Sequence, residues 1–386
     1  MSFNIKLKTR PFKEFYHLKA KYGYLVKSIR YEFKPIKTGG FMKSVELNYS
    51  KTKIDKAGEL LKSKDVSNRE KHMALDILSN WRAIHAVPLD IFARVLKTRA
   101  QKIRSGAIIA QRLKRTPSIL LKLSNHKTMR LSAMQDIGGL RAILETTEDV
   151  YKLLELYKKS RSKHSLFSLD DYIQDPKKDG YRGIHLVYKF LRTPNIFLEI
   201  QLRSQLQHIW ATGVEVFGTL KNSSFKSGHG SQRWLEFFSL LSSVFAIKEK
   251  KQILKQHRSL SQDELVRKLK NLIAELQVID NLNVYTAVYK TISQKTATGR
   301  KGHYSLILLN SRENTISLKT FGARQFDVAA KTYLDLERNH FNDKQINIVL
   351  VNTGDIKKLE ASYPNYFMDT KTLVRYLSLI MLEKFI

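Results

Sequence analysis

Apolar and polar residues alternate from Phe197 to Arg203, which predicts a β-strand with one buried and one polar face. The polar face carries Glu199, Gln201 and Arg203. A carboxylate, an amide and a guanidinium in a row suit a surface that handles a metal-bound phosphate. A strand face exposed to solvent explains the same pattern when this strand is considered alone.

Two further strands are predicted near it. The apolar run 137–144 directly follows Asp136 and predicts a buried strand. Asp136 is either a Mg²⁺ ligand at a strand edge or a cap of a helix or turn. The strand 183–190 follows a turn made by Pro176 and the pair 179–180. Tyr181, at the end of that turn, either stacks on a base or packs on the core.

The segment 111–123 is basic and contains a break at 116–118. This pattern predicts a basic helix, a turn, and a second helix capped by Thr116 that bears Ser118 and Lys122. Helix N-termini and cationic side chains both favour phosphates. The charge run is equally typical of a solvated helix face.

The sequence predicts both helices and strands in the rest of the chain. Helices are expected within 51–104, at 150–157, over 233–256 and after the capping residue Ser261, and a polar loop is expected between 158 and 170. His85, in an apolar setting, is expected to be a packed residue. The C-terminal part predicts strands at 284–292, 303–310, 315–321 and 346–352, and helices at 326–341 and 373–385.

Charge and composition narrow the class of protein. The 386 residues include 42% hydrophobic residues, enough for a core, and carry a formal net charge of +33, which favours a polyanionic partner such as RNA. The absence of cysteine excludes disulfides and thiolate metal sites. Because we find neither a signal peptide nor an apolar run of membrane-spanning length, we expect no membrane association and a cytoplasmic location.

Four motifs, in order, resemble the synthetase domain of the RelA/SpoT family, which makes the alarmones ppGpp and pppGpp. They are RLKRTPSILLK (112–122), DIGGLR (136–141), DYIQDPKKDGYRGIH (171–185) and EIQLR (199–203) followed by QHIWA (207–211). The segment 80–92 also resembles a stretch found in one branch of single-domain members. No His-Asp pair of the family's hydrolase domain is found, so we expect a protein that only synthesises.

The resemblance implies a role for each matching residue. It assigns ATP binding to Arg112, Lys114, Ser118, Lys122 and Arg141. It assigns acceptor binding to Lys177, Tyr181, His185, Gln201 and Arg203, with Tyr181 stacking on the guanine. It makes Asp136 and Glu199 catalytic residues and ligands of Mg²⁺, with Glu199 alternatively orienting the attacking hydroxyl. His208 is expected to support the strand.

The resemblance also implies a fold and a reaction. We expect an α+β fold with a mixed, mainly antiparallel sheet flanked by helices. The expected parts are a basic arm (1–45), a synthetase domain (46–258) and an accessory α+β domain (259–386). The implied reaction moves the β,γ-pyrophosphate of ATP to the ribose 3′-hydroxyl of GDP or GTP.

Other functions remain open. The acceptor can instead be the 3′ end of tRNA, as in toxic family members and as the net charge favours, or an adenine nucleotide, giving (p)ppApp. A non-catalytic module that binds RNA or nucleotides is a further alternative. Homo-oligomers are common among small members of the family. A role in stress signalling, phage defence or as a toxin cannot be distinguished from the residues.

Overall fold

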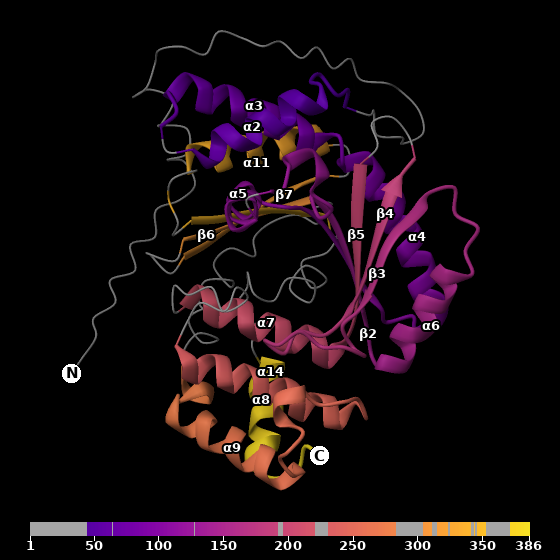
Figure 1. Cartoon of the computed structure of the whole chain (residues 1–386), viewed down its shortest axis with the longest axis vertical. Coiled ribbons are helices and arrows are strands. Elements are labelled where there is room, and N and C mark those ends of the chain that lie inside the picture. Colours follow the sequence, from indigo (N-terminus) through magenta and orange to yellow (C-terminus); the bar gives the residue numbers. More distant parts are fainter. Residues whose placement is uncertain are drawn as a thin grey trace, which may run out of the picture. The chain divides into compact units, whose positions relative to one another are not determined.

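The computed structural model describes most of the chain after the N-terminal arm (Figure 1). The described residues are 45–63, 65–126, 128–191, 196–220, 231–282, 304–310, 315–322, 325–340, 343, 346–352 and 371–386. They belong to one structural unit, residues 43–386. The strand predicted at 284–292 and nearly all of the basic arm lie outside them.

A five-stranded sheet holds the residues singled out above. Its strands are β1 (Ile108–Leu113), β2 (Gly138–Leu144), β3 (Ser165–Asp171), β4 (Ile184–Phe190) and β5 (Ile196–Ser204). Their order is β1-β2-β5-β4-β3; β2 and β5 run parallel and all other neighbours antiparallel. The prediction of a mixed, mainly antiparallel sheet is confirmed.

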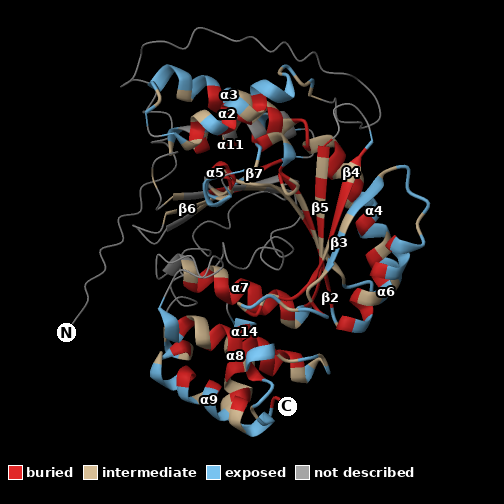
Figure 2. Cartoon of the chain, viewed as in Figure 1, coloured by how far each residue is buried: buried red, intermediate tan, exposed pale blue. Residues whose placement is uncertain are grey.

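Helices share one apolar core with this sheet. They are α2 (Lys51–Lys62), α3 (Asn68–Ala83), α4 (Ala86–Ile103), α5 (Thr116–Asn125) and α6 (Thr147–Lys158). α4 packs against β1 and β2, and α6 packs against β5 and α4. Leu198, Ile200 and Leu202, the apolar side of β5, are fully buried (Figure 2).

A second apolar core joins four helices: α7 (Gln205–Leu220), α8 (Gln232–Lys248), α9 (Gln262–Glu275) and α14 (Lys371–Met381). Ser261 caps α9, as the sequence predicts, and the structure adds a capping box with Glu264. Since α9 and α14 pack on α7 and α8, this core continues across the predicted limit at residue 258. The domain limits themselves stay a prediction.

The C-terminal segment also forms a small antiparallel sheet. Its strands are β6 (Tyr304–Asn310), β7 (Thr315–Phe321) and β8 (Ile346–Asn352), in the order β7-β6-β8. The helix α11 (Phe326–Asn339) packs on this sheet, and β8 lies next to β1. These strands and this helix match the predicted ranges within a few residues.

Three local predictions are wrong. Residues 111–113 belong to β1 rather than to a basic helix, because 108–113 pair with 138–143 of β2. The predicted loop up to 170 contains β3, an edge strand whose mostly exposed residues give no alternating pattern. The helix α8 ends at Lys248 instead of 256, and Lys250 has a left-handed backbone (φ 54°).

A fourth prediction needs a small correction. Arg115 occupies the cap position of α5, and Thr116 is the first residue of the helix. Its hydroxyl bonds to groups from other parts of the chain, which are described below.

His85 is confirmed as a packed residue: it is fully buried, and its Nδ1 lies 2.8 Å from the carbonyl oxygen of Trp81.

Candidate active site

One face of the five-stranded sheet collects polar side chains from several strands. The register places Gln201 of β5 opposite His185 of β4. In the next row, Arg112 of β1 lies opposite Gly139 of β2, which lies opposite Glu199 of β5. Residues opposite each other share a face, and so do residues two apart on one strand. The alternation predicted for β5 therefore creates a polar surface that runs across the sheet.

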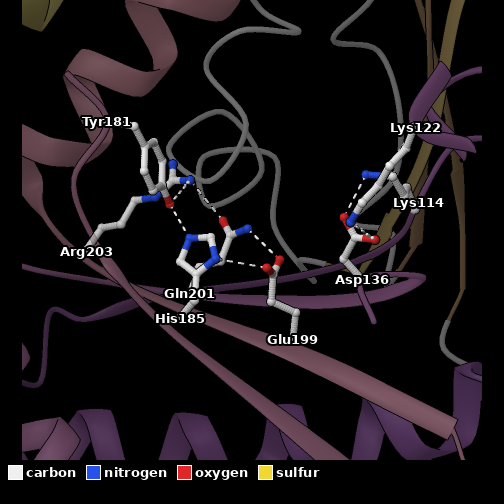
Figure 3. Close-up of polar contacts among 8 residues, drawn as sticks. All are labelled: Lys114, Lys122, Asp136, Tyr181, His185, Glu199, Gln201 and Arg203. Carbon is white, nitrogen blue, oxygen red and sulfur yellow. Dashed lines mark hydrogen bonds and ion pairs between the residues drawn. The ribbon is translucent and has the colours of Figure 1, made fainter. Parts of the chain in front are cut away.

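Asp136 lies just before β2 and is held by two lysines (Figure 3). Its Oδ2 is 2.8 Å from Nζ of Lys114, and its Oδ1 is 3.0 Å from Nζ of Lys122. Lys114 follows β1, and Lys122 lies on α5. The segment 111–123 thus folds back over the start of β2, and its basic residues surround a carboxylate.

A cavity of about 80 Å³ opens on this surface. Both predicted catalytic carboxylates line it, together with most of the cations predicted to bind ATP. Its walls are formed by Ala110, Arg112, Lys114, Asp136, Gly139, Leu140, Arg141, Glu199 and Gln201. The structure therefore brings Asp136, just before β2, and Glu199 of β5 to one cavity.

Five side chains beside the cavity form a closed ring of contacts. Nδ1 of His185 lies 2.9 Å from Glu199, and its Nε2 lies 2.5 Å from the hydroxyl of Tyr181. Arg203 donates to that hydroxyl at 3.0 Å and to the amide oxygen of Gln201 at 2.9 Å. Gln201 donates to Glu199 at 2.7 Å and closes the ring. Of the five side chains, Glu199 lies nearest to Asp136 (Figure 3).

The ring changes the acidity of its members. Burial alone would raise the pKa of Glu199, but the hydrogen bond and charge of His185 outweigh it and lower the pKa to about 2. Burial alone would lower the pKa of His185, but the charge of Tyr181 and the contact with Glu199 raise it to about 9. The charges of Arg203 and His185 overcome burial and lower the pKa of Tyr181 to about 8. Glu199 is therefore ionised at neutral pH.

The turn before β4 fixes Tyr181 at the edge of this ring. The amide of Tyr181 donates to the carboxylate of Asp179 at 2.9 Å. Gly180 has a positive φ of 98°, and its carbonyl oxygen accepts from the Ser242 hydroxyl of α8 at 2.6 Å. Nζ of Lys177 lies 5.4 Å from the centre of the Tyr181 ring. The turn thus presents a ring and a cation side by side.

Tyr172 is a candidate that the sequence reasoning missed. Its ring meets Tyr181 and His185 edge-on, with centres 5.9 and 5.2 Å apart, and Nζ of Lys177 lies 4.4 Å from its centre. The available signal was its place in the segment DYI (171–173), directly after β3. Because β3 was not predicted, nothing placed this tyrosine opposite Tyr181.

The side chains of this site supply only some of the ligands that a magnesium ion needs. Among the described residues, no group of three or more His, Cys, Asp or Glu side chains could hold a metal ion. Asp136 and Glu199 nevertheless line one cavity and supply carboxylate oxygens, which Mg²⁺ prefers. Mg²⁺ usually takes its remaining ligands from water and substrate phosphates. The donor set therefore fits a Mg²⁺ ion that is bound together with phosphates.

Four predicted residues neither line the cavity nor belong to the ring: Lys122 and Lys177, whose contacts with Asp136 and Tyr181 are given above, and Ser118 and His208. Ser118 lies on α5 four residues before Lys122, the spacing of neighbours on one helix face. His208 is buried on α7, which packs against β5 and β2. A larger cavity of about 370 Å³ lies between α7, α8 and residues 178–179 and is lined by none of the predicted site residues.

The fold and the site together define an α+β domain with cations and carboxylates clustered on its sheet, an arrangement that suits phosphate binding. Residues 111–224 match the family described as "Region found in RelA / SpoT proteins". The chain therefore contains a region that is found in RelA/SpoT proteins, as the motifs indicate. No helix among the described residues has both the length and the apolar character needed to cross a membrane.

Curated relatives match the same part of the chain. The chain is 33% identical over 112 residues to the GTP pyrophosphokinase YjbM of Bacillus subtilis (strain 168). The aligned part is 27% of this chain and 52% of YjbM. The chain is 32% identical over 126 residues to the probable chloroplastic GTP diphosphokinase RSH2 of Arabidopsis thaliana. The aligned part is 31% of this chain and 16% of RSH2. The chain thus spans about half or less of the length of these relatives.

A solved structure is also similar. It is the small alarmone synthetase 1 from Bacillus subtilis bound to its product pppGpp. The two sequences are 24% identical, the alignment covers 42% of this chain and 90% of the synthetase chain, and the TM-score is 0.36. This likeness is too weak to support a conclusion about function.

Proposed function

We propose that the protein is a pyrophosphokinase that transfers the β,γ-pyrophosphate of ATP to the ribose 3′-hydroxyl of GDP or GTP. The bond from the 3′-oxygen to the β-phosphorus forms, and the bond between the β-phosphorus and the α,β-bridging oxygen breaks. AMP leaves with the bridging oxygen, and the hydroxyl proton passes to a base or to water. Such a transfer depends on positioning and on charge neutralisation rather than on a covalent intermediate.

The ATP side of the site consists of the cations around Asp136. Lys114 and Lys122 approach each other because they share that carboxylate, so triphosphate oxygens entering the cavity meet both ammonium groups. Arg112 and Arg141 line the same cavity. In this proposal Arg112 contacts the adenine, and Ser118 and Arg141 contact phosphates.

The acceptor side consists of the turn and the ring of contacts. The rings of Tyr181 and Tyr172 with Lys177 offer a stacking surface and a cation for a guanine nucleotide, where stacking contributes roughly 1–3 kcal/mol per base. His185 and Arg203 connect this surface to Glu199. A bound acceptor would therefore sit beside the ionised carboxylate.

Asp136 and Glu199 would hold Mg²⁺ together with the phosphates of ATP, and the ion would neutralise charge that develops on the transferred group. In this proposal Glu199 also orients the attacking hydroxyl. At a pKa of about 2 this carboxylate is a weak base at neutral pH, so its proposed task is orientation by hydrogen bonding.

The observation that carries the proposal is the cavity shared by Asp136, Glu199 and the cations within the RelA/SpoT region. The test supplies purified protein and Mg²⁺ with ATP labelled at the γ-phosphate and offers GDP, GTP, ATP and deacylated tRNA separately. We expect label in a guanine nucleotide and loss of transfer in Asp136→Asn, but not in the control Asp335→Asn, which changes an exposed carboxylate on α11. Labelling of none of the four acceptors by the wild-type protein contradicts the proposal.

A second candidate is transfer to the 3′ end of tRNA, which the formal net charge of +33 favours. Lys177 and Lys178 lie on the acceptor turn, and Lys255 is tied to it by an ion pair with Asp175 at 3.3 Å. These cations could attract a polyanion to the acceptor side. Label in tRNA with none in the nucleotides would select this candidate.

A further inference from the structure

A buried cluster joins the C-terminal helix α11 to the start of α5. It consists of Arg82 from α3, Thr116 from α5, and Tyr333 and Glu337 from α11. Their exposed fractions are 1, 5, 3 and 9%. Charged side chains are rarely this deeply buried unless they are paired, so the arrangement of these four defines a specific contact.

The carboxylate of Glu337 lies at the N-terminus of α5. It accepts from the Thr116 amide at 3.2 Å and from the Thr116 hydroxyl at 3.0 Å. The amides at a helix N-terminus have no partner within the helix, and the helix dipole favours a negative charge there. Arg115, the cap residue of α5, makes no side-chain cap hydrogen bond. Glu337 therefore acts as a cap supplied from about 220 residues away along the chain.

Arg82 and Tyr333 hold this carboxylate in place. Arg82 donates to Glu337 at 2.6 Å, to the Thr116 hydroxyl at 2.9 Å and to the Tyr333 hydroxyl at 2.6 Å. Tyr333 donates to the second oxygen of Glu337 at 2.7 Å. Burial alone would lower the pKa of Arg82, but the charges of Glu337 and Tyr333 raise it, so the guanidinium stays charged. Both carboxylate oxygens thus have a donor from outside α5.

The capped turn lies between the two lysines that hold Asp136. Lys114 comes two residues before Thr116, and Lys122 comes six residues after it on the same helix. Because Lys114 precedes α5 and Lys122 lies on it, the position of the start of α5 contributes to the separation of these two ammonium groups. A shift of this helix by about 1 Å would move Lys122 relative to Asp136, and misplacements of that size are costly in active sites.

We propose that Glu337 is a positioning residue for ATP: it anchors the start of α5 and so places Lys114 and Lys122 to bind the triphosphate. This inference rests on the proposed function, because it assumes that these lysines bind ATP. It gives the C-terminal segment a part in the nucleotide site, although α11 contributes no residue to the cavity. Glu337 acts through Thr116 and does not touch the substrate.

The test measures binding of α,β-methylene-ATP with Mg²⁺ to the full-length protein by calorimetry. Glu337→Gln keeps the shape of the side chain and removes its charge. We expect its Kd for the analogue to rise on the order of tenfold, while the Kd for GDP changes less than twofold. The matched control is Asp335→Asn on the exposed side of α11, which should bind like the wild type. Unchanged affinity of Glu337→Gln for the analogue overturns the inference, as does an equal loss for both ligands.

A double variant separates positioning from stability. Replacing a buried ion pair by apolar residues is often neutral for folding. Arg82→Met combined with Glu337→Met should therefore keep a thermal midpoint near that of the wild type, yet still bind the analogue weakly. A double variant with wild-type affinity for the analogue would show that the cluster serves folding alone. If instead the wild-type protein binds the analogue but transfers no pyrophosphate, the proposed reaction fails and the positioning of ATP stands.

Discussion

The carboxylate of Glu199 lies 2.9 Å from Nδ1 of His185, on the neighbouring antiparallel strand. The other ring nitrogen of His185 faces the hydroxyl of Tyr181. A single imidazole therefore links the residue proposed to bind the acceptor base to the residue proposed to orient the attacking hydroxyl. Binding of the acceptor and alignment of Glu199 are expected to depend on each other through this contact.

Replacing the linking imidazole should reduce the rate more than the affinity for ATP. In His185→Gln, Glu199 loses its charged partner and its fixed position, so we expect kcat to fall roughly 10- to 100-fold. The KM for ATP should stay within about twofold, because the ATP side does not include this residue. The measurement is the initial rate of AMP release at varied ATP. A kcat equal to that of the wild type would rule out the proposed link.

The two lysines on Asp136 should affect ATP selectively. Lys114→Ala and Lys122→Ala each remove one charge-assisted contact to the triphosphate, and we expect each to raise the KM for ATP roughly 10-fold or more. The KM for GDP should change little. Lys319→Ala, on β7, serves as a control for the loss of a positive charge. Equal effects on both substrates would mean that these lysines support the fold rather than ATP.

The turn that carries Tyr181 should not tolerate a side chain at Gly180. A Cβ there would lie 2.8 Å from Cβ of Ser242 and 3.1 Å from the Trp210 ring, and φ is 98°. We expect Gly180→Ala to destabilise the protein by roughly 1–3 kcal/mol and to raise the KM for the acceptor. Gly106→Ala is the matched control, because no atom lies within 4 Å of the Cβ it adds. Chemical denaturation measures the difference; a Gly180→Ala protein as stable as the control would be contrary to the described turn.

Buried His85 should make stability depend on pH. Burial lowers its pKa from 6.5 to about 4, so between these values the unfolded chain binds a proton that the folded chain does not. The stability linked to this group is complete above pH 6.5 and is lost as the pH falls toward 4. We expect the free energy of unfolding to decrease by roughly 2 kcal/mol across this window.

The test compares His85→Gln with the wild-type protein in denaturant titrations at several pH values. The difference between the two should shrink as the pH falls from 7 to 4, since the variant lacks the titrating group. His72→Gln, which replaces an exposed histidine of α3, is measured alongside as the control for losing a histidine side chain. A constant difference between wild type and His85→Gln would show that His85 does not titrate in this way.

The central strands could be predicted because their sequences carry the physical signal directly. β5 alternates, β2 is apolar apart from Arg141, and the pair 179–180 specifies the turn before β4. Edge strands gave weaker signals: β1 leads directly into the basic residues Lys114 and Arg115, and the residues of β3 are mostly exposed. Their structure is set by pairing with β2 and β4, which a local pattern does not contain.

The site was predictable as a set of residues but not as a geometry. The motifs named Asp136, Glu199 and the cations around them, and the structure brings these side chains to one cavity. The ring through His185 depends on the register of β4 with β5, and the cap on α5 comes from Glu337, far away in sequence. Neither contact can be read from spacing, because each depends on tertiary packing.

The most direct measurement is the ratio of the products that form in one reaction mixture. Purified protein is incubated with Mg²⁺, GDP and ATP, and AMP, ADP and the new guanine nucleotide are separated and quantified. The account predicts one AMP for each molecule of product, with two phosphates added to GDP and no transfer in Glu199→Gln or Asp136→Asn. Formation of ADP in place of AMP, or unchanged transfer in both variants, would contradict pyrophosphate transfer at this site.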